Sequence, residues 1–177
     1  WNKLGFISDA DCEKICKNAK FEVARIDEIE KTTKHDVIAF LTSVSESLGE
    51  ESRFVHYGMT SSDCIDTAVA LQMKESLELI ISDVEEFMQA VKNRANEHKH
   101  TLMVGRSHGI HGEPITFGLV LAIWYDEIAR ALKLIKDAKD TISYGKLSGA
   151  MGNLAHAPME FEELTCEELG LKAAPAS

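Results

Sequence analysis

Four short stretches of this chain gather histidines, hydroxyl groups and glycines between segments of helical character. The most pronounced is Gly105–Pro114, GRSHGIHGEP, in which His108 and His111 stand between glycines and close to Arg106. Histidine suits proton transfer because its unperturbed pKa is about 6.5. Exposed histidines on a glycine-rich turn are the simpler alternative. Two histidines and one glutamate are too few for a metal site at this spacing, so we expect no metal.

A second stretch, HYGMTSSD, carries four consecutive residues that cap helices well, Thr60, Ser61, Ser62 and Asp63. A long helix needs only one such cap. The surplus hydroxyl groups, beside backbone amides at the positive end of a helix, suit a bound carboxylate or phosphate.

The other two stretches each allow two interpretations. The simpler interpretation of KTTKHDV is a solvated helix face that carries Lys34, His35 and Asp36. The alternative is that Lys34 and His35 donate hydrogen bonds to an anion. In GKLSGAMGN, residues 145–153, the clustered glycines fit either a flexible connection or a close approach of the backbone to a ligand.

Long helices must position these stretches. Apolar residues recur at three- and four-residue steps through Ile65–Val91, and neither Pro nor Gly interrupts residues 60–104, which predicts one helix of roughly ten turns. A second stripe covers Phe117–Ala138, with Pro114 placed in the first turn of its helix. Two such stripes suit near-antiparallel packing in a bundle.

The rest of the chain predicts an all-α fold. We expect small helices within residues 9–49, a short acidic helix within residues 159–170, and no strand. The predicted organisation is a small N-terminal helical domain, residues 1–59, whose start is missing, followed by residues 60–177 as the first part of a long-helix bundle. Because the chain opens without Met and stops just after a helical segment, we expect a piece of a longer protein.

Composition narrows the class of partner. A formal net charge of -10 argues against nucleic-acid binding, which needs a basic face, but leaves a small anion open. No apolar run approaches the length of a membrane span, so we expect no membrane partner. The closest cysteines, Cys12 and Cys16, have helical spacing rather than that of a zinc or redox site. With no secretory signal, we expect a reducing cytoplasm.

Taken in order, TTKHDVIAF, VHYGMTSSDCIDTA, GRSHGIHGEPITFG and GKLSGAMGN resemble the adenylosuccinate lyase family, the purine-pathway branch of the fumarase/aspartase superfamily. The resemblance covers nearly the whole chain. It implies a homotetramer of three-domain subunits in which each active site is built from three subunits. The implied reaction is β-elimination of fumarate from adenylosuccinate, giving AMP, and from the succinyl-carboxamide ribotide, with no metal or organic cofactor.

The same resemblance implies roles for individual residues. His108 is the general acid that protonates the departing nitrogen, and His35 assists it. Ser107 stands where the family often has Thr and keeps the hydroxyl group. His56 and His111 match motif positions but receive no chemical step. The implied substrate contacts are Lys34, His35, Asp36, Thr60, Ser61 and Ser107.

Two alternatives to this function stay open. One is another lyase of the superfamily, although the KHDV run and HGIHGEP favour the purine branch. The other is a non-catalytic helical scaffold, which would not need His35, Thr60, Ser61 and His108 together. The loop that carries the family's catalytic serine is not among these residues, so we expect the 177-residue chain alone to be inactive. The long apolar stripes predict self-association.

Overall fold

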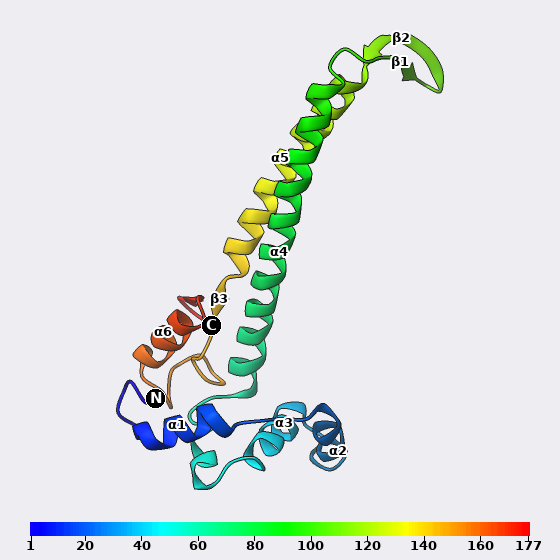
Figure 1. The fold of residues 1–177 in the computed structure, drawn as a ribbon. Coiled ribbons are helices and arrows are strands. Elements are labelled where there is room, and N and C mark those ends of the chain that lie inside the picture. Colours follow the sequence, from blue (N-terminus) through cyan, green and yellow to red (C-terminus); the bar gives the residue numbers. More distant parts are fainter. The chain divides into compact units, whose positions relative to one another are not determined.

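The computed structural model describes residues 1–177, which form two compact units. The first unit comprises Trp1–Ala68 and Tyr144–Ser177, and the second comprises Val69–Ser143. Helix α4 (Ser61–Glu97) begins in the first unit and continues without a break into the second (Figure 1). Helices dominate both units, as the all-α prediction required. The division into domains 1–59 and 60–177 stays a prediction.

The first unit is built from short elements, as expected for its N-terminal part. Ser8 caps its first helix by accepting a hydrogen bond from the Asp11 backbone N–H at 3.1 Å. Gly170, with a φ of +64°, follows its last helix in the left-handed conformation that commonly ends helices. The elements are α1 (Asp9–Asn18), α2 (Val23–Thr33), α3 (Asp36–Ser45), the 3₁₀ helix η1 (Glu50–Phe54), β3 (Tyr144–Gly145), α6 (Met159–Glu168) and β4 (Lys172–Ala173).

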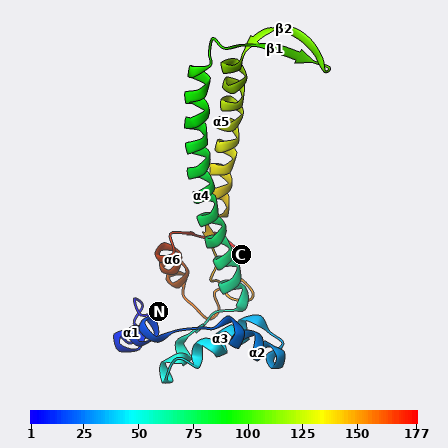
Figure 2. The ribbon, with the colours of Figure 1, turned by 45° about the vertical axis from the view of Figure 1, so that its right-hand side comes forward.

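The second unit is a pair of long helices joined by a β-hairpin. After α4 come β1 (Leu102–Ser107), β2 (Ile110–Thr116) and α5 (Phe117–Ile142). Lys136 of α5 pairs with Glu85 of α4 at 2.6 Å, and Lys139 pairs with Glu78 at 3.6 Å. The later residue on α5 pairs with the earlier residue on α4. The two helices are therefore antiparallel, as both views show (Figures 1 and 2). The predicted packing is confirmed.

Gly118 brings the start of α5 against the end of α4. Its backbone N–H donates to the His98 carbonyl at 3.0 Å. A Cβ at position 118 would lie 2.5 Å from the Ala95 carbonyl oxygen and 2.6 Å from the Lys99 Cα, which no side chain tolerates. Only glycine therefore allows this approach.

The hairpin corrects two predictions, the absence of strands and the place of Pro114. Pro114 lies within β2, opposite Val104, and the residue that caps α5 is Thr116, whose side chain accepts from the Leu119 N–H at 3.2 Å. The two-residue turn is His108–Gly109, with φ values of +53° and +74°. Positive φ at both positions matches the twist of antiparallel strands and closes the hairpin.

Apolar side chains remain at the surface of the long helices. The predicted stripes are only partly covered by the pairing of α4 with α5, and Phe87 and Trp124 are each about half exposed. Further exposed apolar residues on these helices include Ile65, Val69, Met73, Ile80, Leu119 and Ile123. None of the helices combines the length and the apolar character needed to cross a membrane.

Candidate functional site

Lys34, His35 and Asp36 occupy the junction between α2 and α3, so their interpretation as a helix face is wrong. Lys34 ends α2 in the left-handed conformation, with a φ of +52°, and its N–H donates to the Glu30 carbonyl at 2.8 Å. Its ammonium group forms no ion pair within the chain. A free cation beside a helix start is suited to an anion.

His35 caps α3 with its ring. Nδ1 accepts from the Ile38 N–H at 3.4 Å and lies 3.3 Å from the Asp36 carboxylate. When Nδ1 accepts, the neutral ring carries its proton on Nε2, which is then the donor available to a ligand. The sequence placed the three residues together, and the structure adds the helix junction that orients them.

The start of α4 presents two hydroxyl groups that the fold itself does not use. Thr60 and Ser61 are half-buried, and neither hydroxyl group has a hydrogen-bond partner in the chain. Asp63, in the first turn of α4, accepts from the Thr60 N–H through Oδ2 at 2.9 Å. Hydroxyl groups without a partner are thus present at this helix start, and their use in binding an anion stays a prediction. Free hydroxyl groups beside the first amides of a 37-residue helix can hold an anionic oxygen.

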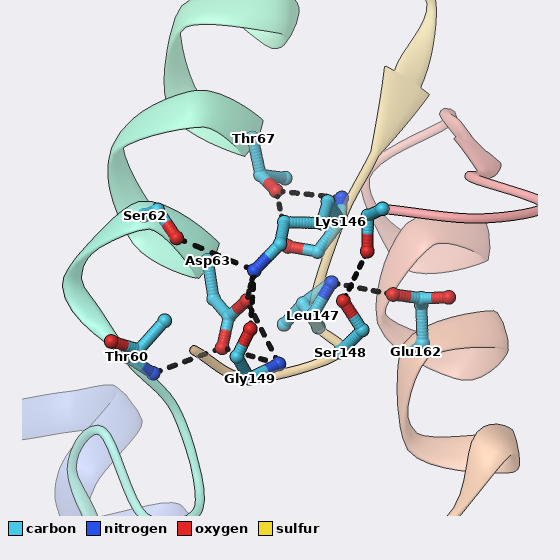
Figure 3. A network of polar contacts seen from close by, with 10 residues as sticks. Thr60, Ser62, Asp63, Thr67, Lys146, Leu147, Ser148, Gly149 and Glu162 are labelled. Atoms are coloured by element: carbon cyan, nitrogen blue, oxygen red, sulfur yellow. Dashed lines mark hydrogen bonds and ion pairs between the residues drawn. The ribbon is translucent and has the colours of Figure 1, made fainter. Parts of the chain in front are cut away.

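Sequence reasoning missed the partner of Asp63. The Asp63 side chain is fully buried, and Lys146 Nζ donates to its Oδ1 at 2.6 Å. The Gly149 N–H donates to the same carboxylate, at 3.2 Å to each oxygen. Figure 3 shows the lysine side chain reaching from the loop after β3 to the first turn of α4. The sequence marked Asp63 as a residue that suits a helix start, but nothing in the sequence singled out Lys146.

The glycine-rich segment that holds Lys146 is anchored from both sides, so its interpretation as a flexible connection is wrong. The Thr67 hydroxyl donates to the Lys146 carbonyl at 2.9 Å and accepts from the Lys146 N–H at 3.0 Å. The Leu147 N–H donates to the buried Glu162 carboxylate at 2.6 Å. A Cβ at Gly145 would lie 2.7 Å from Cys166 Sγ, so this position leaves no room for a side chain.

His108 and Ser107 lie on the exposed hairpin of the second unit, whereas the other predicted site residues belong to the first. Neither side chain has a hydrogen-bond partner in the chain. Within the first unit, Thr60 and Ser61 lie together at the start of α4. No group of three or more histidine, cysteine, aspartate or glutamate side chains converges in a way that could hold a metal ion.

His56, which the sequence assigned no step, has an unusual conformation. Its φ of +66° is left-handed, and its Nε2 is buried without a hydrogen-bond partner. Buried polar atoms are normally paired, and exceptions concentrate at functional sites. Because His56 lies four residues before Thr60 in the same stretch, we add it to the candidate site residues.

Residues 6–177 match the protein family described as Lyase, and the chain belongs to that family. Over all 177 residues it is 67% identical to adenylosuccinate lyase of Helicobacter pylori and 50% identical to that of Bacillus subtilis. The chain spans 40% and 41% of the length of these two relatives. A fumarate lyase from Mesorhizobium sp. BNC1 superimposes with a TM-score of 0.90 at 26% identity, over 99% of this chain and 43% of that one. The all-α fold class and the resemblance are confirmed.

Proposed function

We propose that the whole protein containing this chain eliminates fumarate from adenylosuccinate, giving AMP, and from the succinyl-carboxamide ribotide. The observation that carries the proposal is the 67% identity to an adenylosuccinate lyase across a span that includes all four polar stretches. Other lyases of the superfamily remain the second candidate, because the Mesorhizobium fumarate lyase shares the fold at 26% identity.

The elimination needs a base, an acid and a site for the charge that develops. A base removes a proton from the carbon next to a carboxylate, and that electron pair forms the double bond of fumarate while the carbon–nitrogen bond breaks. The departing nitrogen takes a proton from His108, which must be the imidazolium before the step and is neutral afterwards. The resemblance assigns the base to a serine outside these 177 residues.

The first unit supplies substrate contacts in this proposal. Thr60 and Ser61 hold a substrate carboxylate through their hydroxyl groups, supported by the free amides at the start of α4. Lys34, His35 and Asp36 form a second set of contacts, and His35 assists the acid by positioning the substrate. Ser107 is a further contact beside His108.

The assembly is part of the proposal. Exposed His108 on a hairpin, together with uncovered apolar faces on α4 and α5, supports a homotetramer whose active sites combine residues from three subunits. Four free cysteines fit a reducing cytoplasm, which we propose as the location.

Fumarate release from adenylosuccinate tests the function. We expect turnover by the whole protein and none by the 177-residue chain, with argininosuccinate, aspartate and malate as competing substrates in parallel reactions. Faster elimination from one of these three would replace the proposal with a sister lyase. A correctly assembled whole protein that acts on none of them would be a helical scaffold.

A further inference from the structure

The pair Asp63–Lys146 places two opposite charges in a buried environment, where desolvation makes a charged group unfavourable. The Asp63 side chain is 0% exposed and that of Lys146 is 18% exposed. Removing two ions from water costs more than their attraction returns unless further hydrogen bonds satisfy them. Such a pair therefore calls for an explanation other than stability alone.

Both charged groups are fully bonded. The Lys146 ammonium uses its three donors on Asp63 Oδ1 at 2.6 Å, on the Gly149 carbonyl at 2.7 Å and on Ser62 Oγ at 3.3 Å. The Asp63 carboxylate accepts from that ammonium and from the N–H groups of Thr60 and Gly149. The bonds from Lys146 to Asp63 and Ser62, and from Gly149 to Asp63, connect the first turn of α4 to the anchored loop, as Figure 3 shows.

The bonds reach the proposed substrate contacts directly. Asp63 binds the backbone of Thr60, Lys146 binds the side chain of Ser62, and Ser61 lies between them. The backbone that carries both free hydroxyl groups is therefore held on either side. The charge of Lys146 also matters, because a lone buried carboxylate at this position would repel a substrate carboxylate bound at Thr60 and Ser61.

We propose that Asp63 and Lys146 are a positioning pair for substrate binding, an inference that rests on the proposed lyase function. Asp63 fixes the start of α4 so that the Thr60 and Ser61 hydroxyl groups meet a substrate carboxylate. Lys146 neutralises Asp63, so that the same turn of helix attracts an anion rather than repelling it.

The test compares binding of fumarate and of AMP to variants of the whole protein by titration calorimetry. For Asp63→Asn, which keeps the cation, we expect fumarate to bind about tenfold more weakly. For Lys146→Met, which leaves the carboxylate alone, we expect a loss of about a hundredfold. The Asp63→Asn/Lys146→Met double variant should fall between the two. AMP should bind within about twofold of wild type throughout, and KM should rise more than kcat falls.

Glu162→Gln is the matched control. Glu162 is also a buried carboxylate that bonds the same loop, through the Leu147 N–H, but it makes no bond to the start of α4. We expect Glu162→Gln to lower thermal stability as the Asp63 variant does and to leave fumarate binding within about twofold. Equal losses for fumarate and AMP, or equal losses in the control, would overturn the proposal.

The double variant protects the test against misfolding, because it leaves no buried charge unpaired. If Lys146→Met does not fold, wild-type fumarate binding in both Asp63→Asn and the double variant overturns the positioning role. Failure of the proposed function gives a different result, since wild type would then release no fumarate from adenylosuccinate. Direct binding of fumarate still decides the role of the pair in that case.

Discussion

The start of α4 and the hairpin beyond its end are polar regions of opposite design. At the start, every polar atom of Asp63 and Lys146 has a partner within the chain. At the hairpin, His108 is exposed and has no partner, and the helices that carry the hairpin leave apolar side chains such as Phe87 half uncovered. One region is complete within a single chain, and the other offers its groups outward.

This difference distinguishes groups that are held in place for binding from groups that are exposed for contact with another molecule. Groups that hold a substrate must keep one geometry, which the Asp63–Lys146 clamp at the start of α4 provides. In the proposed tetramer, a proton donor that serves a neighbouring subunit must project from its own. We therefore expect substitutions at the clamp to alter binding, and substitutions on the hairpin to alter chemistry.

The largest effect should follow from His108→Asn in the whole protein. Asparagine cannot supply a proton to the departing nitrogen, so kcat should fall by about a hundredfold to ten-thousandfold. Fumarate release measures the loss, and light scattering checks that the oligomer stays intact. His111→Asn, on the same hairpin, is the control and should lose less than about tenfold.

Mixing two impaired variants sharpens the same comparison. Subunits with His108→Asn, combined with subunits that carry Ser61→Ala, should regain part of the activity if the two regions meet across a subunit boundary. Recovery absent from a properly mixed oligomer would place both residues in the active site of one chain. Unchanged turnover by His108→Asn itself would remove this residue as the acid.

A smaller effect is expected for Gly118→Ala, which disturbs the base of the hairpin. The added methyl group would lie 2.5 Å from the Ala95 carbonyl oxygen, so the two helices must separate there. Overpacking of this kind lowers the free energy of unfolding by about 1–3 kcal/mol, which urea titration measures. Gly112→Ala in β2 meets only ordinary contacts at 3.6 Å and should change it by less than about 0.5 kcal/mol. Equal stability of the two variants would contradict the close approach.

The smallest effect concerns thiol reactivity in the first unit. Burial, with the Glu162 charge as a second cause, raises the pKa of the Cys166 thiol, so less thiolate forms near neutral pH. We expect iodoacetamide to modify exposed Cys16 well before Cys166, and the lag to shrink as the pH rises toward the raised pKa. Mass spectrometry of the peptides follows both sites, with urea-unfolded protein as the reference. Equal rates in the folded protein would mean that the loop around Lys146 opens readily.

The sequence was sufficient for the long helices but not for the hairpin between them. Apolar residues at three- and four-residue steps made α4 and α5 visible, because such spacing covers one face of a helix. The strands had no comparable signal, since most side chains of β2 are exposed and do not alternate between apolar and polar. Pro114 was misleading because its preference for a first helical turn is equally compatible with an exposed edge strand.

The site divides in the same way. The free hydroxyl groups of Thr60 and Ser61 followed from a local argument about helix capping, which needs only neighbours in sequence. The pairing of Asp63 with Lys146 depends on where the chain returns after α5, and no local pattern encodes that return. His56 likewise looked ordinary until its left-handed backbone and unpaired ring nitrogen were seen.

The clamp between Asp63 and Lys146 also bears on the order of folding, because the two residues are 83 positions apart in sequence. Closing a free loop of that length would cost about 4 kcal/mol of chain entropy. The hydrogen bonds within each helix and within the hairpin are local in sequence, so we expect them to form sooner. We therefore expect α4, the hairpin and α5 to fold first and the Asp63–Lys146 clamp to form second. During synthesis, the turn that carries Thr60 and Ser61 lacks its bonds to the loop until Lys146 has emerged from the ribosome.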